Sequence, residues 1–187
     1  MNNPQYIFSM YKMSKVYPGG KQVLKDISLS FLPGAKIGVL GGNGAGKSTL
    51  LKIMAGIDNE FNGDAKLADG IKVGYLAQEP ELDNNLNVYE NVMEGMFEAK
   101  SLVDEFNLIS LKFSEDLTDE EMNETISKQG ELQEKIDNMD AWDLDRKAEI
   151  AMDALSLPPG KAKIVNLSGG EKRRVALAKL LLSNPDF

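Results

Sequence analysis

Residues 41–48 read Gly41-Gly42-Asn43-Gly44-Ala45-Gly46-Lys47-Ser48, which fits the phosphate-loop pattern G-x-x-x-x-G-K-S/T. The apolar run Ile37–Leu40 comes directly before this segment, and the helix-forming stretch Thr49–Ala55 comes directly after it. We expect the run to be a buried strand and the stretch to be a helix. Because the pattern requires a strand, a loop and a helix in this order, the segment predicts an α/β nucleotide-binding core.

The composition of the loop suits a chain of phosphate groups. Glycines let the backbone approach a polyanion without side-chain clashes and turn consecutive amides toward it, and the helix that follows adds its positive end. Lys47 is predicted to bind the β- and γ-phosphates, and the Ser48 hydroxyl is predicted to ligate Mg²⁺. The predicted nucleotide-binding residues of this segment are Gly41, Gly42, Asn43, Gly44, Ala45, Gly46, Lys47, Ser48 and Thr49.

A second glycine-rich helix start, Leu167-Ser168-Gly169-Gly170-Glu171, lies far along the chain. Ser168 is a natural N-cap, and the two glycines leave backbone amides accessible to an anion. Alone, such a pattern usually marks only a capped helix. A phosphate loop 121 residues before Ser168 makes a functional role the stronger interpretation.

The first 80 residues favour strands. Alternating apolar positions predict strands at Tyr6–Tyr11 and Ile27–Phe31, and two shorter strands follow near 64–67 and 71–76. Turn residues separate these segments, and Gly56 is a plausible C-terminal cap for the loop helix. We therefore expect a β-rich nucleotide-binding core over residues 1–86.

Residues 88–157 change to helical patterns with few glycines and no proline. Leu102, Phe106, Ile109 and Phe113 form one apolar stripe of a helix, and Thr118–Glu121 is a capping box that begins the next helix. The short connection predicts an antiparallel hairpin, an arm over about 97–140. A third helix is expected near 143–155. The predicted helical subdomain covers 87–166, and the signature segment with its helix covers 167–187.

The bulk composition limits the classes of protein. The chain has 187 residues, no cysteine and a net charge of −8, and no stretch approaches the roughly 18 apolar residues of a membrane span. The N-terminus shows no signal-peptide pattern, and the lack of cysteine fits the expected cytoplasmic location. Residues 98–146 hold 15 acidic and 5 basic residues, against 14 and 16 in the rest. A solvated helix face is the plain explanation of this acidity.

The phosphate loop, Gln78 after a short predicted strand, a helical segment and Leu167–Glu171 together resemble an ATP-binding-cassette ATPase across nearly the whole chain. The resemblance implies ATP and Mg²⁺ as cofactors. It places Tyr17 under the adenine, although an ordinary tyrosine at a strand end is the alternative. It gives Gln78 a catalytic role in positioning Mg²⁺ and the attacking water, beside Lys47.

Several segments are more similar to the soluble F branch of this superfamily than to transporter cassettes. Glu171 replaces the glutamine usual in transporters, and residues 27–40, 75–80 and 157–159 also resemble this branch. The resemblance implies a cytoplasmic translation factor that binds the ribosome near the exit-tRNA site, with ribosomal protein, rRNA and tRNA as partners and no membrane. Since RNA repels an acidic arm, we expect the arm to meet a basic ribosomal protein or to project by shape.

The family pattern continues with an aspartate-ending Walker B strand, a catalytic glutamate and a switch histidine, and this sequence has no histidine. We therefore interpret the chain as the N-terminal cassette fragment of a longer ATPase, truncated before the Walker B strand. The fragment alone is expected to be inactive. The resemblance also implies that Ser168, Gly170 and Glu171 complete the ATP site of a second cassette. The alternative is the ATPase subunit of a membrane transporter. The 121-residue spacing argues against a long coiled-coil chromosome ATPase.

Overall fold

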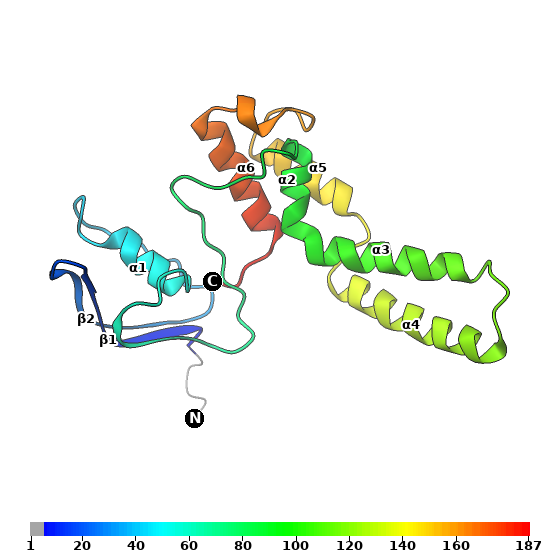
Figure 1. Ribbon diagram of the computed structural model, residues 1–187, viewed down its shortest axis with the longest axis horizontal. Coiled ribbons are helices and arrows are strands. Elements are labelled where there is room, and N and C mark those ends of the chain that lie inside the picture. The colour runs from blue at the N-terminus through cyan, green and yellow to red at the C-terminus, as the bar shows by residue number, and fades with distance from the viewer. Residues whose placement is uncertain (1–5) are drawn as a thin grey trace. The chain divides into compact units, whose positions relative to one another are not determined.

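The computed structural model describes residues 6–187, which form two compact units (Figure 1). The first unit contains the described residues up to Tyr75 together with Asn184–Phe187, and the second unit contains Leu76–Ser183. Residues 1–5, where the sequence predicts no signal peptide, lie outside the described residues.

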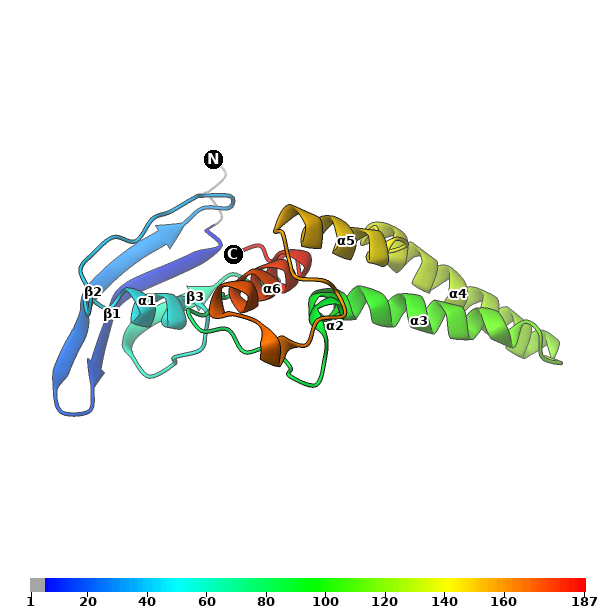
Figure 2. The same ribbon diagram turned by 90° about the horizontal axis from the view of Figure 1, so that it is seen from above.

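The first unit contains a three-stranded antiparallel sheet. Its strands are β1 (Phe8–Tyr17), β2 (Lys21–Phe31) and β3 (Asn62–Leu67), in the order β2-β1-β3. β1 and β2 form a long hairpin, which both ribbon views show (Figures 1 and 2). The strands predicted from alternating positions in this part of the chain are confirmed.

Helix α1 (Lys47–Met54) supplies an apolar face to the core of this unit. Leu50, Ile53 and Met54 are buried with the apolar side chains of the sheet. Phe187 stacks on the ring of Phe8, with 5.5 Å between ring centroids. The helix ends as predicted, because Gly56 has a φ of 71° and its N–H donates to the carbonyl of Ile53.

Two predicted core strands are wrong. Ile37–Leu40 lies in no strand, and Leu40 is 95% exposed rather than buried. Residues 71–76 also form no strand, although the carbonyl of Lys72 accepts a hydrogen bond from the N–H of Asp186. A strand is stable only with a paired neighbour, and across residues 6–187 the sheet pairs only β1, β2 and β3. Apolar runs therefore indicated strand propensity, whereas pairing depends on distant segments.

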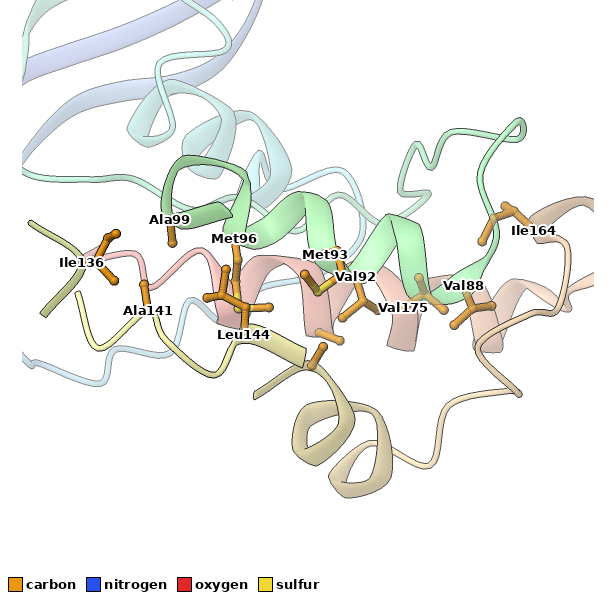
Figure 3. Packing of buried hydrophobic residues seen from close by; sticks show 12 residues of the cluster. Val88, Val92, Met93, Met96, Ala99, Ile136, Ala141, Leu144, Ile164 and Val175 are labelled. Atoms are coloured by element: carbon orange, nitrogen blue, oxygen red, sulfur yellow. The ribbon is translucent and has the colours of Figure 1, made fainter. Parts of the chain in front are cut away.

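The second unit is helical. It contains α2 (Val88–Met93), the 3-10 helix η1 (Glu94–Met96), α3 (Phe97–Lys112), α4 (Asp119–Asn138), α5 (Leu144–Ala154), the 3-10 helix η2 (Ile164–Asn166) and α6 (Gly169–Leu182). Its buried core, drawn in Figure 3, comprises Val88, Val92, Met93, Met96, Ala99, Ile136, Ala141, Leu144, Ala148, Ile164, Val175 and Ala178.

Helices α2, η1 and α6 approach closely because of one glycine. A Cβ atom added to Gly95 would lie 2.2 Å from the carbonyl oxygen of Lys179, so any larger residue would push α6 away. Beside this contact, the Lys179 ammonium forms an ion pair with Glu94 at 2.5 Å. The segment η1 is thus packed tightly against the C-terminal half of α6.

Helices α3 and α4 form the predicted antiparallel arm and lie side by side in both ribbon views (Figures 1 and 2). The capping box is confirmed, since the Thr118 side chain accepts from the Glu121 N–H while Glu121 accepts from the Thr118 N–H. Between the helices, Gln129 donates to the Ser110 hydroxyl at 2.9 Å. The third predicted helix is also confirmed as α5. Within residues 6–187, no helix has the length and apolarity needed to cross a bilayer.

Candidate nucleotide-binding site

Residues 41–46 form a loop that ends in α1, and Gly46 determines how the loop enters the helix. Gly46 is the N-cap with a φ of 92°, in the left-handed region. A Cβ atom at this position would lie 2.7 Å from Cγ1 of Val23 and 2.9 Å from Cδ2 of Leu24, both on β2. The residue is therefore fixed as glycine by backbone conformation and by close packing of the loop on the sheet.

The N-terminus of α1 is electrostatically open. No side chain caps it by a hydrogen bond within the described residues, and its first turn contains no acidic residue. The first N–H groups of a helix have no intrahelical partner, and the aligned peptide dipoles place partial positive charge there. The Ser48 side chain is exposed at this end. The loop and helix thus present amide and hydroxyl groups to an anion.

The Lys47 ammonium folds back over the loop. Its Nζ donates to the carbonyl oxygens of Gly41 and Gly42, each at 2.7 Å. The cation therefore lies against the backbone of the loop, which is predicted to bind the phosphates.

Tyr17 and Thr49 are brought together by the fold although 32 residues separate them. The Tyr17 hydroxyl lies 3.1 Å from Oγ1 of Thr49. Tyr17 is the last residue of β1 and is 38% exposed, so part of its side chain remains accessible. Together with Lys47 and Ser48, these side chains place polar and aromatic groups around the start of α1.

The signature segment forms a capped helix start in the second unit. The Ser168 hydroxyl accepts from the Glu171 N–H at 3.3 Å and donates to the Glu171 carboxylate at 2.7 Å. The same carboxylate accepts from the Ser168 N–H at 2.8 Å. The two hydrogen bonds that the carboxylate accepts from Ser168, the one from the hydroxyl foremost, lower the pKa of Glu171 together with the charge of Arg174. Leu167 precedes the cap, and Gly169 and Gly170 open α6 with no atom close to where a Cβ would lie.

Gln78 lies in the second unit and is exposed. Its backbone carbonyl accepts a hydrogen bond from Nε of Arg173, at 2.7 Å, across 95 residues of sequence. The segment around Gln78 is thereby tied to the signature helix α6. The sequence indicated no role for Arg173. The residues around an arginine in a helix do not show which distant carbonyl its side chain will contact.

The predicted residues fall in both units. The first unit brings together the loop 41–48, Thr49 and Tyr17, whereas Gln78 and the signature 167–171 belong to the second. Lys15 is buried beside Tyr17 in the first unit, and sequence reasoning did not single it out. Lysine is rarely buried, and one lysine within an alternating strand gives no signal of a charged partner elsewhere.

The profile of the ABC transporter family matches residues 24–187. This chain belongs to the ABC ATPase family. It is 54% identical over 183 residues to the energy-dependent translational throttle protein EttA of Mycobacterium tuberculosis, and 47% identical to EttA of Escherichia coli strain K12. It is also 33% identical over 187 residues to the tylosin resistance ATP-binding protein TlrC of Streptomyces fradiae.

These matches cover 98% to 99% of this chain but only 32% to 34% of the relatives. The chain thus spans about a third of the length of the curated relatives it matches.

Two solved structures share the fold. One is cbiO1 of Clostridium perfringens, part of the ABC transporter complex cbiONQ, with 23% identity and a TM-score of 0.53 over 96% of this chain and 62% of that chain. The other is a metal-chelate type ABC transporter in an inward-facing conformation, with 19% identity and a TM-score of 0.55 over 95% of this chain and 56% of that chain. At this level of identity the similarity shows the ABC ATPase fold alone, and it carries no information about a transported substrate.

Proposed function

We propose that this chain is the ATP-binding cassette of a cytoplasmic translation factor whose ATP-driven closure governs its binding to the ribosome. The observation that supports this most strongly is the 54% identity to an energy-dependent translational throttle protein across 98% of the chain. The α3–α4 arm, an extended helical hairpin within the cassette, agrees with a protein that reaches toward a large partner.

The residues at the start of α1 fit Mg²⁺-ATP. The open helix terminus and the amides of residues 41–48 would hold the phosphates, with Lys47 neutralising their charge. Ser48 would ligate Mg²⁺, because a hydroxyl oxygen is the kind of ligand that this hard cation takes. The Tyr17 ring would stack on the purine, an interaction that suits adenine and guanine alike.

The second unit would act on a nucleotide held by another cassette. In this proposal Ser168, Gly170 and Glu171 contact the γ-phosphate of that nucleotide, and Gln78 positions Mg²⁺ and the attacking water at its own cassette. The hydrolytic site is then complete only when two cassettes close on each other. Accordingly, we propose that the isolated chain hydrolyses no ATP, while the closed pair does.

The arm would direct the cassette to its place on the ribosome, near the exit-tRNA site. Its exposed carboxylates, among them Glu120, Glu124, Glu131 and Glu134, would be repelled by rRNA and tRNA phosphates and attracted by a basic ribosomal protein. Contacts with rRNA and tRNA would then come from other surfaces of the protein.

A transporter subunit is the competing function. Both solved structures named above are transporter ATPases, but their identity to this chain is below 25% and concerns the fold alone. The much higher identity to EttA proteins over nearly the whole chain favours the translation factor.

Co-sedimentation with bacterial ribosomes tests the proposal. The whole protein that carries this cassette is expected to pellet with ribosomes in ATP and to remain in the supernatant in ADP, at one fixed salt concentration. Lys47→Ala should abolish the ATP dependence, whereas Lys52→Ala, an exposed lysine on the same helix, should preserve it. A protein that binds ATP yet never pellets with ribosomes would contradict the proposal and favour a membrane partner.

A further inference from the structure

Lys15 is one of only two polar or charged residues that are buried within residues 6–187, at 3% exposed. It lies in β1, two residues before Tyr17. Removing an ammonium group from water is costly unless the charge is paired, so its position requires a specific partner.

The nearest partner of Lys15 is Asp58, in the loop between α1 and β3, and the exposed carboxylate of Glu60 lies farther from Nζ, at 3.9 Å. The distance from Nζ of Lys15 to Oδ1 of Asp58 is 2.7 Å, and the Asp58 side chain is itself only 18% exposed. The Asp58 carboxylate also accepts the Glu60 N–H at 3.1 Å. These contacts, the Lys15 hydrogen bond foremost, hold the pKa of Asp58 below its usual value. The ammonium is thus fixed in place at neutral pH.

The fixed ammonium lies against the ring of Tyr17. Its Nζ is 5.2 Å from the ring centroid, within the range of about 6 Å in which a cation is attracted to an aromatic face. At its other end, the Tyr17 hydroxyl meets Oγ1 of Thr49 on α1. The ring is therefore held at its face and at its hydroxyl, while part of the side chain stays exposed.

We propose that Lys15, anchored by Asp58, is a positioning residue for nucleotide binding, which holds the Tyr17 ring in the orientation that receives the base. The inference rests on the proposed function, in which Tyr17 stacks on the purine. Lys15 acts through Tyr17 and does not touch the phosphates. Its loss should therefore weaken recognition of the base and leave recognition of the phosphates unchanged.

The same strand offers a matched control. Nζ of Lys12 lies 5.3 Å from the ring centroid of Tyr11, so the geometry of cation and ring is nearly the same. Lys12 is exposed, and Tyr11 is not among the residues gathered around the start of α1. A lysine-to-methionine change at each position therefore compares a cation–ring contact beside the site with one away from it.

The experiment measures two affinities of the 187-residue chain by calorimetry, one for ATP and one for inorganic tripolyphosphate, which has no base. Lys15→Met should weaken ATP binding about three- to tenfold and leave tripolyphosphate binding unchanged. Lys15→Arg should keep the ATP affinity of the wild-type chain, because a guanidinium can pair with a carboxylate and stack on a ring. Lys12→Met should change neither affinity.

The outcomes separate the inference from the proposed function. An unchanged ATP affinity in Lys15→Met, or an equal loss for both ligands, overturns the positioning role while the proposed function stands. A wild-type chain that binds neither ligand overturns the proposed function and the inference with it. If Lys15→Met does not fold, the double variant Lys15→Met/Asp58→Asn removes both charges together and is held to the same expectations.

Discussion

Helices α1 and α6 both begin at glycine-rich segments, yet their N-termini are in opposite electrostatic states. α1 begins at Gly46 with no side-chain cap and no acidic residue in its first turn. α6 begins at Ser168 with a complete capping box, and the Glu171 carboxylate occupies its positive end. An anion can approach the first helix directly, whereas at the second it must compete with a carboxylate. Two glycine-rich helix starts can therefore differ in whether they accept an anion. The difference depends on whether capping side chains already accept hydrogen bonds from the first N–H groups of the helix.

The largest effect is expected at the open helix start, from Gly46→Ala. A methyl group there would lie 2.7 Å from Val23 and would force a left-handed backbone on alanine. We expect a loss of stability of about 2 kcal/mol or more and a loss of ATP binding. Scanning calorimetry and an ATP titration measure the two effects.

Gly42→Ala is the control for that change, because Gly42 has no atom within 4 Å of the added Cβ and no positive φ. Its stability should stay within about 0.5 kcal/mol of wild type. Equal stability losses in the two variants would show that packing on β2 does not distinguish Gly46.

Next in size is Lys47→Ala, which removes the cation from the open helix start. Since a hydrogen bond to a charged group contributes about 1.5–3 kcal/mol, ATP affinity should fall roughly 10- to 100-fold. Calorimetric titration with ATP measures the change, and Lys52→Ala on the same helix should keep wild-type affinity. Retained affinity in Lys47→Ala would remove this lysine from the phosphate site.

The capped helix start is tested by comparing Ser168→Ala with Thr118→Ala. Each residue caps its own helix of the second unit through a capping box of the same kind. Each change should therefore lower the free energy of unfolding by about 1 kcal/mol. Urea unfolding followed by the fluorescence of Trp142, the single tryptophan, measures both. In the whole protein, only Ser168→Ala should also lower ATPase activity, and an equal activity loss from Thr118→Ala would refute a ligand role specific to Ser168.

The smallest effect is expected from Glu171→Gln. The fold lowers the pKa of Glu171 below its ordinary value of 4.5, so the ionised form stabilises the native state. This contribution is present above pH 4.5 and is lost as the pH falls through the lowered pKa. The glutamine variant should be less stable than wild type at neutral pH, and the difference should shrink in acid.

Urea unfolding by Trp142 fluorescence across that pH range measures this difference. Glu121→Gln in the arm is the matched control, because the Thr118 N–H and hydroxyl lower the pKa of Glu121 in the same way. A stability difference for Glu171→Gln that does not change with pH would show that the carboxylate charge does not stabilise α6.

Much of the fold could be read from local patterns. The capping box at Thr118, the arm hairpin, the C-terminal cap at Gly56 and the sheet strands were predicted and are confirmed. The strands at Ile37–Leu40 and at 71–76 were predicted wrongly, since a run of apolar residues does not specify the neighbour that must pair with it.

By itself, the sequence determined the phosphate-loop motif and the signature motif, because each depends on residues within a few positions of one another. It also determined the family resemblance, which depends on the order and spacing of these motifs along the chain. Only the tertiary structure decided that Gly46 packs on β2, that Asp58 pairs with buried Lys15, and that Arg173 reaches the carbonyl of Gln78. Such contacts join residues tens of positions apart, and their free energy depends on burial and geometry that exist only once the chain has folded.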